Sequence, residues 1–285
     1  MNGIIVVNKE IGYTSRDIVN IVGSILGTKK VGHTGTLDPM ASGVLVLCVG
    51  KALKVCELLT NHDKEYIAGV TLGIETDTLD MEGNIISTEI VDIDKERIIE
   101  VVNSFVGVYN QGVPKYSSVK VNGKKLYEYA RNNISVELPS RDVEIKSIQI
   151  IDDIIYEDGK VYFTIKCSVS KGTYIRSLVR DIASRIGTVA VMNRLIRIRQ
   201  GNFNIDEAYS LDDIKNGNFQ FIDIPSAFSY IPRIIVDDKI AFKVRNGVIL
   251  DKFFDSKMAF ILDKNNNLLA IYKNIDNKSR AYRVF

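Results

Sequence analysis

The chain contains the stretch Gly32-His33-Thr34-Gly35-Thr36-Leu37-Asp38-Pro39-Met40-Ala41-Ser42-Gly43-Val44-Leu45-Val46-Leu47, in which a short polar segment runs directly into an apolar one. The apolar run, which continues to Val49, predicts a buried strand. Because proline presets its φ angle and glycine allows left-handed geometry, the segment before the strand predicts a stiff loop that carries Asp38. On its own, an Asp-Pro step among glycines is typical of an ordinary turn. A chemical role for Asp38 therefore needs support from the rest of the chain.

Length and composition limit the class of protein. The 285 residues are 46% hydrophobic and 25% charged, which predicts a globular chain of one or two domains. The three cysteines lie in apolar runs without CxxC spacing, so they predict free, buried thiols in a reducing compartment. With two histidines and no cysteine cluster, the composition argues against a metal site. The N-terminal apolar run is too short for a signal peptide and no 18 apolar residues run together, so we expect a cytoplasmic protein without a membrane segment.

Charge is strongly segregated along the chain, although its net value is only +2. Residues 75–100 hold nine acids against two basic residues, which predicts a solvated face turned away from any polyanion. Residues 171–199 hold seven basic residues against Asp181, and residues 113–131 interleave lysines with tyrosines. Basic side chains among aromatic ones suit phosphate contacts and base stacking, and a merely solubilising surface explains the charge pattern equally well.

The pattern along the chain predicts an α+β fold without a regular βαβ alternation. Apolar runs or alternation predict strands at residues 4–7, 44–49, 66–72, 143–151 and 161–169. Helical periodicity and capping residues predict helices at 14–27, 53–59, 98–105, 124–131 and 211–216, and another that begins near Arg176. An Asn-Gly turn stands at 122–123.

The last part of the chain has a different pattern. Turn signals at residues 246–247 and 265–267 separate short apolar runs after a boundary near residue 230, which predicts a small all-β barrel. This segment holds eleven basic residues against six aspartates, which is compatible with RNA contact.

Three other enzyme classes lack their motifs in this chain. Six residues separate Gly43 from Gly50 where a phosphate loop requires four, and Ala52 stands in the position of the Mg²⁺-binding hydroxyl. The sequence has no Gly-x-Ser-x-Gly elbow and no Gly-x-Gly-x-x-Gly fingerprint. These gaps argue against an NTPase, an esterase and a dehydrogenase.

The stretch around Asp38 closely resembles the signature of the TruB family, the tRNA pseudouridine-55 synthases, whose Gly-His-Thr-Gly-x-Leu-Asp-Pro motif carries the catalytic nucleophile. Further along, Lys64-Glu65-Tyr66 resembles the second motif of the family, and Lys171-Gly172-Thr173-Tyr174-Ile175-Arg176 resembles the third. The run from Val119 to Arg131 is similar to the thumb insertion that closes on the tRNA arm in bacterial members. The resemblance covers most of residues 3–200, and the motifs occur in the order expected for the family.

By resemblance, Asp38, Tyr66 and Arg176 are the catalytic residues. Pseudouridylation needs an ionised carboxylate that can bond to the nucleoside and leave again, and an arginine partner holds and aims it. The resemblance further implies that Tyr66, Tyr174 and Leu195 surround a flipped uracil and that His33 fills the space the base has left. It also assigns Lys9 and Lys54 to the pocket floor and the phosphates, and Lys124 and Lys125 to the tRNA-gripping thumb. Without the resemblance, Tyr66 and Leu195 are ordinary packing residues and Arg176 is a surface ion pair.

The resemblance therefore implies isomerisation of uridine 55 in the TΨC loop of tRNA. It implies a pseudouridine synthase fold at residues 1–230, with a mainly antiparallel mixed sheet, flanking helices and a thumb at 113–133, and a PUA-like barrel at 231–285. The reaction involves no redox change and no energy input, so we expect no cofactor and no metal. We expect a monomer that binds the tRNA T-arm without an obligatory protein partner. Two alternatives remain open, namely a guide-RNA-dependent catalytic subunit and a non-catalytic RNA-binding or RNA-folding module.

Overall fold

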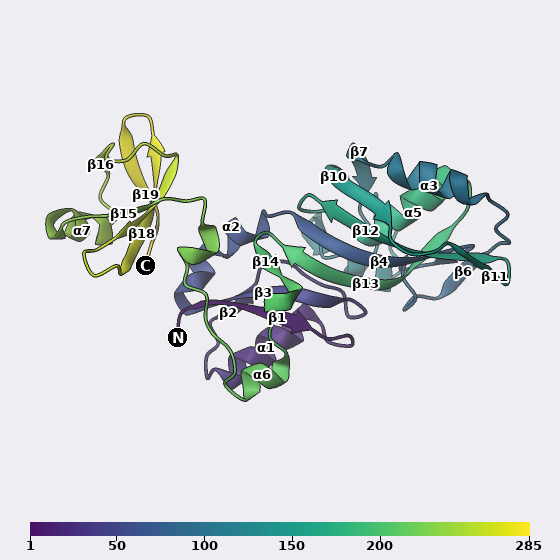
Figure 1. Ribbon diagram of the computed structural model, residues 1–285, viewed down its shortest axis with the longest axis horizontal. Helices are drawn as coiled ribbons and strands as arrows, with labels where there is room; N and C mark the ends of the chain where they lie inside the picture. Colours follow the sequence, from purple (N-terminus) through teal and green to yellow (C-terminus); the bar gives the residue numbers. More distant parts are fainter.

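The computed structural model describes residues 1–285, and its larger body is built on a ten-stranded sheet (Figure 1). The main path of this sheet runs β1–β3–β13–β4–β12–β10–β7. The bounds of these strands are β1 Gly3–Lys9, β3 Ser42–Val49, β4 Lys64–Leu72, β7 Gly107–Gly112, β10 Ser140–Ile150, β12 Lys160–Val169 and β13 Ala190–Gln200, with short additions β2 Val31–His33, β11 Ile155–Glu157 and β14 Phe203–Asn204. Every pairing is antiparallel except that of β3 with β13, so the prediction of a mixed, mainly antiparallel sheet is confirmed.

Helices flank this sheet. The three longest are α1 Ser15–Ile25, α3 Lys95–Asn103 and α5 Ile175–Ile186, and the shorter ones are η1 Gly50–Val55, α2 Cys56–Thr60, η2 Ile205–Glu207, α6 Leu211–Lys215 and η3 Ser226–Phe228. Thr14 caps α1 in a capping box with Asp17, at the start of the helix predicted for residues 14–27. The helix predicted at 53–59 is instead a 3₁₀ turn followed by the single helical turn of α2. A separate hairpin, β5 Ile74–Thr76 with β6 Ile85–Thr88, lies in the acidic region.

Alternation along the central strands decides which side chains face the helices. In β4, Tyr66, Ala68 and Val70 belong to the main hydrophobic core, which also takes in apolar side chains of α1, α3 and α5. Arg197 lies opposite Tyr66 in the register of β13 and β4, and Leu195 lies opposite Ala68. Because side chains alternate across a strand, all of these residues share one face of the sheet.

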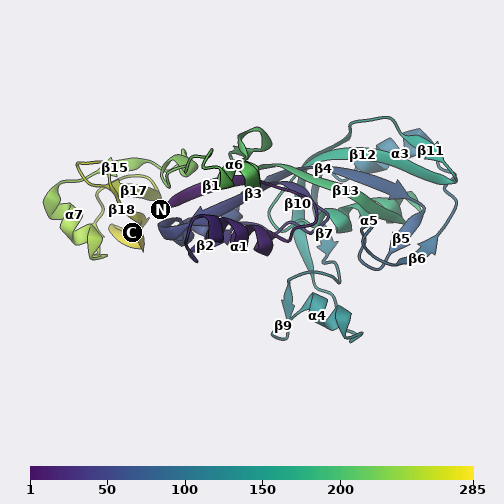
Figure 2. The ribbon, with the colours of Figure 1, turned by 90° about the horizontal axis from the view of Figure 1, so that it is seen from below.

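A hairpin and a short helix project from the body between β7 and β10 (Figure 2). They are β8 Lys120–Val121, β9 Lys124–Lys125 and α4 Leu126–Arg131. Asn122 and Gly123 connect the two strands with φ angles of 49° and 82°, so the Asn-Gly turn forms the predicted hairpin.

The C-terminal body holds a second, five-stranded sheet in the order β15–β17–β18–β19–β16. Its elements are β15 Arg233–Ile235, α7 Asp238–Arg245, β16 Leu250–Asp251, β17 Met258–Leu262, β18 Leu268–Ile275 and β19 Lys278–Val284. The prediction of an all-β segment is wrong because of α7. Asp237 caps this helix, and its buried residues Ala241 and Val244 stand at helical spacing in a segment whose short apolar runs suggested only strands. None of the helices in either body combines the length and the apolar character needed to cross a membrane.

Candidate active site

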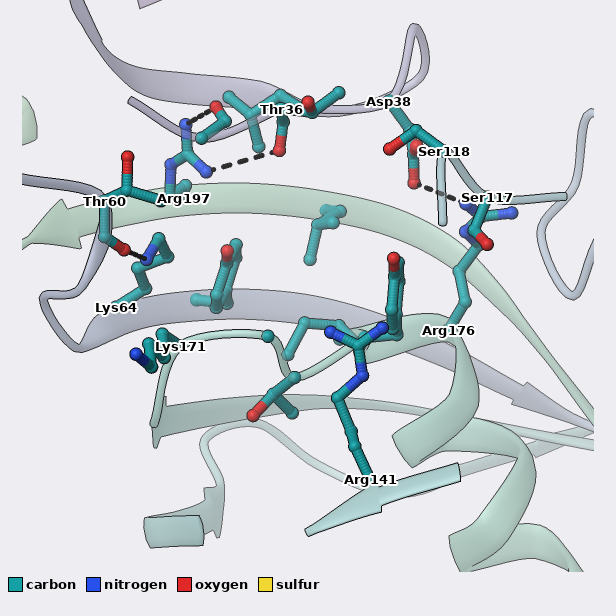
Figure 3. A pocket seen from close by; sticks show the side chains of 18 of the residues that line it. Thr36, Asp38, Thr60, Lys64, Ser117, Ser118, Arg141, Lys171, Arg176 and Arg197 are labelled. Carbon is teal, nitrogen blue, oxygen red and sulfur yellow. Dashed lines mark hydrogen bonds and ion pairs between the residues drawn. The ribbon is translucent and has the colours of Figure 1, made fainter. Parts of the chain in front are cut away.

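A cavity of about 690 Å³ opens where the Asp38 loop, the start of β4, the start of α5 and the segment after β7 meet (Figure 3). Among the predicted site residues, Asp38, Tyr66, Tyr174, Arg176 and Leu195 line it. The structure therefore brings together residues that lie up to 157 positions apart in the sequence.

Two side chains from outside the loop that carries Asp38 fix its backbone. The Ser15 hydroxyl donates to the carbonyl of Leu37 and accepts from its N–H, at 3.0 and 2.8 Å. The Lys9 ammonium donates to the carbonyls of Pro39 and Ala41, at 3.3 and 2.6 Å. The prediction of a stiff loop is therefore confirmed. The Asp38 side chain lines the cavity and is 34% exposed.

Gly43 allows this loop to join the sheet. It has a φ of 101°, and a Cβ atom there would lie 2.2 Å from the carbonyl oxygen of Arg197 on the neighbouring strand. Only glycine tolerates both that conformation and that close approach. The parallel pairing of β3 with β13, which sets the Asp38 loop beside Arg197, therefore depends on this residue.

Arg176 lies between two carboxylates at the N-terminal end of α5. Its Nη2 is 3.0 Å from Oδ2 of Asp38, and its Nη1 is 3.4 Å from Oδ2 of Asp80. It also donates to the carbonyls of Thr78 and Tyr116, at 2.9 and 3.1 Å. The Arg176 side chain is only 6% exposed, so it is not the surface ion pair of the alternative interpretation. Planar guanidinium groups held in this way orient a carboxylate in both distance and angle.

Tyr66 is buried on the cavity face of β4, next to Arg197. Burial raises the pKa of Tyr66 above its ordinary value, although the Arg197 charge acts in the opposite direction. Its hydroxyl therefore stays protonated near neutral pH. Tyr174 stands across the cavity with its ring under the Arg141 guanidinium, 5.4 Å away. The two rings and Leu195 give the cavity apolar surface beside the Asp38 carboxylate.

Four further residues of this region were missed by sequence reasoning. They are Asp80, which pairs with Arg176; Gln111, whose side chain bonds the backbone of Tyr174; and Lys64 and Arg197, which line the cavity. The motif around Tyr66 contains Lys64, and the basic segment 171–199 contains Arg197, so a signal existed for those two. Asp80 stood in a segment interpreted as a solvated acidic face, and nothing local marks Gln111.

The remaining predicted residues do not line the cavity. His33 lies on β2, half-buried, with its Nδ1 unpartnered, and burial lowers its pKa. Lys9 is fully buried beneath the Asp38 loop, where burial lowers its pKa to about 8 against the opposing charge of Asp38. Lys54 donates to the carbonyl of Val284 in the C-terminal body. Lys124 and Lys125 lie on the projecting hairpin, beyond Tyr127, which does line the cavity. Lys9 and Lys54 thus both donate to backbone carbonyls, and their roles toward the substrate stay predictions.

No group of three or more His, Cys, Asp or Glu side chains is arranged to hold a metal ion. The cysteines are free: Cys48 and Cys167 are buried and Cys56 is partly so.

Comparison with known proteins defines the class. Residues 24–175 match the family described as TruB family pseudouridylate synthase (N terminal domain). The chain belongs to the TruB family of pseudouridylate synthases, which confirms the predicted family and the predicted type of enzyme.

Relatives agree with this membership, and solved structures share the fold. The protein named tRNA pseudouridine synthase B of Bacillus subtilis (strain 168) is 43% identical over 261 residues, covering 88% of this chain and 84% of that protein. The protein of the same name in Bacillus anthracis is 39% identical over 284 residues, which cover 96% of this chain and 92% of that protein. A solved Cbf5-Nop10-Gar1 complex contains a chain with a TM-score of 0.71 and 24% identity, covering 99% of this chain and 84% of that one. At that identity the likeness supports the fold alone.

Proposed function

We propose that this chain isomerises uridine 55 in the TΨC loop of tRNA to pseudouridine, with Asp38 as the nucleophile. The observation that carries the proposal is the Asp38–Arg176 ion pair at 3.0 Å, inside a cavity lined by Tyr66, in a member of a pseudouridylate synthase family. The Bacillus relatives named tRNA pseudouridine synthase B support tRNA as the substrate.

The reaction breaks the bond from N1 of uracil to C1′ of the ribose and joins C5 to C1′, while the C5 proton leaves and N1 gains one. Asp38 supplies a carboxylate that bonds to the nucleoside and later leaves. Arg176 aims the reacting oxygen because its Nη2 holds Oδ2 of Asp38 and its Nη1 is anchored on Asp80.

The target base has to leave the stacked loop, which costs a few kcal/mol. The apolar surface formed by Tyr66, Tyr174 and Leu195 offsets that cost by packing on the extruded uracil.

We also propose a role for each domain of the chain. Residues 1–230 form the catalytic domain, 113–133 a thumb that grips the tRNA arm, and 231–285 a PUA-like RNA-binding domain. The projection of the hairpin from the body and the surplus of basic residues in the C-terminal body support these roles. We further propose that the enzyme acts in the cytoplasm as a monomer without a protein partner.

The test is a guide-free assay. Purified protein and an unmodified tRNA transcript labelled with tritium at C5 of uridine are incubated without any added RNA or protein, and tritium release is measured. We expect stoichiometric release from the transcript and none from the same transcript with cytidine at position 55. Release that requires a guide RNA or a protein partner would assign the chain to the guide-dependent class. Binding without release would make it a non-catalytic module.

A further inference from the structure

Three basic side chains gather at the end of the cavity opposite the Asp38–Arg176 pair. Figure 3 shows Lys64, Lys171 and Arg197 on one side and Asp38, Arg176 and Ser117 on the other. Lys64 and Arg197 are buried, at 8% and 1% exposure, whereas Lys171 is exposed.

The two buried cations border the same stretch of backbone. A Cβ atom on Gly35 would be 3.5 Å from both Nη1 of Arg197 and Cε of Lys64, so both side chains border the same backbone position. Burial and the charges of Arg197 and Lys171 together lower the pKa of Lys64 to about 8, against the opposing effect of Asp63. Like charges packed together in a half-enclosed site repel one another strongly.

Carbonyl and amide oxygens, rather than carboxylates, accept the hydrogen bonds of these three side chains. Lys64 donates to the carbonyls of Thr60 and His62, at 3.2 and 2.8 Å, and Lys171 donates to Oδ1 of Asn61 at 2.9 Å. Arg197 donates to the carbonyls of Val44 and Gly35, at 2.7 and 3.0 Å, and more weakly to that of Thr36 at 3.5 Å.

The acidic residues on either side of Lys64 are already engaged elsewhere. Asp63 pairs with Lys146, and Glu65 pairs with Arg199 at 2.6 Å. Arg176, at the other end of the cavity, has two carboxylate partners, so the cavity has one neutralised end and one with an excess of positive charge.

We propose that Lys64, Lys171 and Arg197 form a phosphate subsite, which binds a phosphodiester of the RNA chain directly next to the target nucleotide. The inference rests on the proposed RNA substrate. Uracil and ribose carry no negative charge, so the backbone phosphate is the part of such a substrate that compensates these cations. A nucleotide whose sugar lies at Asp38 has one phosphate on each side, and one of them extends toward this end of the cavity.

The subsite also connects RNA binding to the nucleophile. Arg197 donates to the backbone of Gly35 and Thr36, which lead directly into Asp38. A phosphate held against Arg197 therefore fixes the RNA backbone relative to the loop that carries the reacting carboxylate. Lys171 lies at the exposed rim, where it meets the phosphate first.

The experiment compares Lys171→Met, Lys64→Met and the control Lys166→Met. Lys166 lies on β12 opposite Ile67, so it is on the other face of the sheet from Tyr66 and Lys64. Affinity for a synthetic T-arm RNA hairpin is measured at several salt concentrations. We expect each cavity variant to bind more weakly and to lower the slope of log K against log salt by about one, with the control unchanged. Lys171→Met keeps the test decisive if Lys64→Met does not fold, because Lys171 is exposed.

A second arm locates the phosphate. Two hairpins carry a neutral methylphosphonate in place of the phosphodiester on the 5′ or the 3′ side of the target uridine. One of them should weaken binding to the wild type by the same factor as Lys171→Met, and combining that hairpin with the variant should add no further loss. Unchanged salt slopes in both lysine variants would overturn the subsite. So would affinity losses from Lys171→Met and from the methylphosphonate that are additive for both hairpins. If the wild type forms pseudouridine in these hairpins while the slopes stay unchanged, only the subsite fails; absence of both binding and product in the wild type refutes the RNA substrate itself.

Discussion

Arg176 holds Asp38 with one nitrogen and Asp80 with another, and both geometries depend on the planar fork of its guanidinium. In Arg176→Lys, a single ammonium cannot contact both carboxylates and the carbonyls of Thr78 and Tyr116. We predict that kcat falls at least about a hundredfold, which corresponds to about 2.7 kcal/mol of barrier, while tRNA affinity changes little. Single-turnover rates at saturating tRNA measure this directly, and a rate within a few-fold of the wild type would show that only the charge matters.

The sequence predicted the site residues that stand in local motifs. It did not predict those that reach the site only through the fold. Asp38, Tyr66 and Arg176 stand in contiguous motifs, and the structure places all three around one cavity. Asp80 and Gln111 reach the site from segments with no motif of their own, since their contacts cross 96 and 63 positions of the chain. Lys9 was assigned to the pocket floor by the resemblance, and in the structure it lies under the Asp38 loop, where its ammonium donates to the carbonyls of Pro39 and Ala41.

At the scale of the element, α5 begins at a point fixed by a side chain from another strand. Tyr174, which precedes α5, has no side-chain cap. Instead, its N–H donates to Oε1 of Gln111 at 2.8 Å, and its carbonyl accepts from Nε2 of Gln111 at 3.1 Å. Nε2 also donates to the hydroxyl of Tyr109 at 2.6 Å, and Gln111 is fully buried. This amide pairing fixes the start of the helix from which Arg176 extends.

Gln111→Met keeps the side-chain length but removes the donor and the acceptor. We predict a loss of about 1–3 kcal/mol in the free energy of unfolding, because the N–H of Tyr174 loses its acceptor and its carbonyl loses one of two donors. We also expect kcat to fall while tRNA affinity is retained, since Arg176 loses its fixed origin. Denaturant unfolding and single-turnover rates measure the two effects, with Gln149→Met on the exposed side of β10 as the matched control. Equal stability and rate in Gln111→Met and the control would refute this positioning role.

The projecting hairpin and α4 form an element that has few partners in the body. Lys124 is exposed and Lys125 lies beside the ring of Tyr127, at 5.3 Å. Neutralising both lysines to alanine should weaken tRNA binding and flatten its salt dependence, with a smaller effect on the rate at saturating tRNA. The double variant of Lys29 and Lys30, an exposed adjacent pair after α1, is the control for lost charge. Identical affinity and salt slope in the thumb variant and the wild type would show that this element does not grip RNA.

Prediction of elements was most successful where one pattern dominates. The apolar runs of β1 and β3 and the alternation of β4 and β12 gave strands close to the observed bounds. The helix α7 was missed because its eight residues lie between short apolar runs in a segment dominated by turn signals. A pattern of eight residues is consistent with a helix or a strand. The packing of Ala241 and Val244 against the second sheet favours the helix.

At the scale of the whole molecule, the two bodies share a hydrophobic cluster. Ile4, Val6 and Val46 of the first sheet belong to the same buried cluster as Phe260 and Ile271 of the second. The cluster connects through Phe228, whose ring packs on that of Phe260 at 5.8 Å, so the C-terminal body shares buried apolar contacts with the part of the first body that holds β1 and β3. Its packing supports the catalytic body in addition to any contact with RNA.

A chain that ends at residue 230 would expose this cluster. We predict that its free energy of unfolding falls by several kcal/mol, at about 1.5–3 kcal/mol for each large apolar side chain that loses its cover. Thermal melting of the two chains measures the difference, and the shorter one should also bind an apolar dye. The same melting temperature for both chains would show that the catalytic body is stable by itself.

The role of Asp38 as the nucleophile of a pseudouridine synthase is tested by comparing Asp38→Asn with the wild type on an unmodified tRNA transcript. The amide keeps the shape of the side chain but cannot form and break the bond to the nucleoside. We predict no detectable pseudouridine in the variant and tRNA affinity within a few-fold of the wild type. Pseudouridine formation within about tenfold of the wild-type rate, or about 1.4 kcal/mol of barrier, would contradict the account.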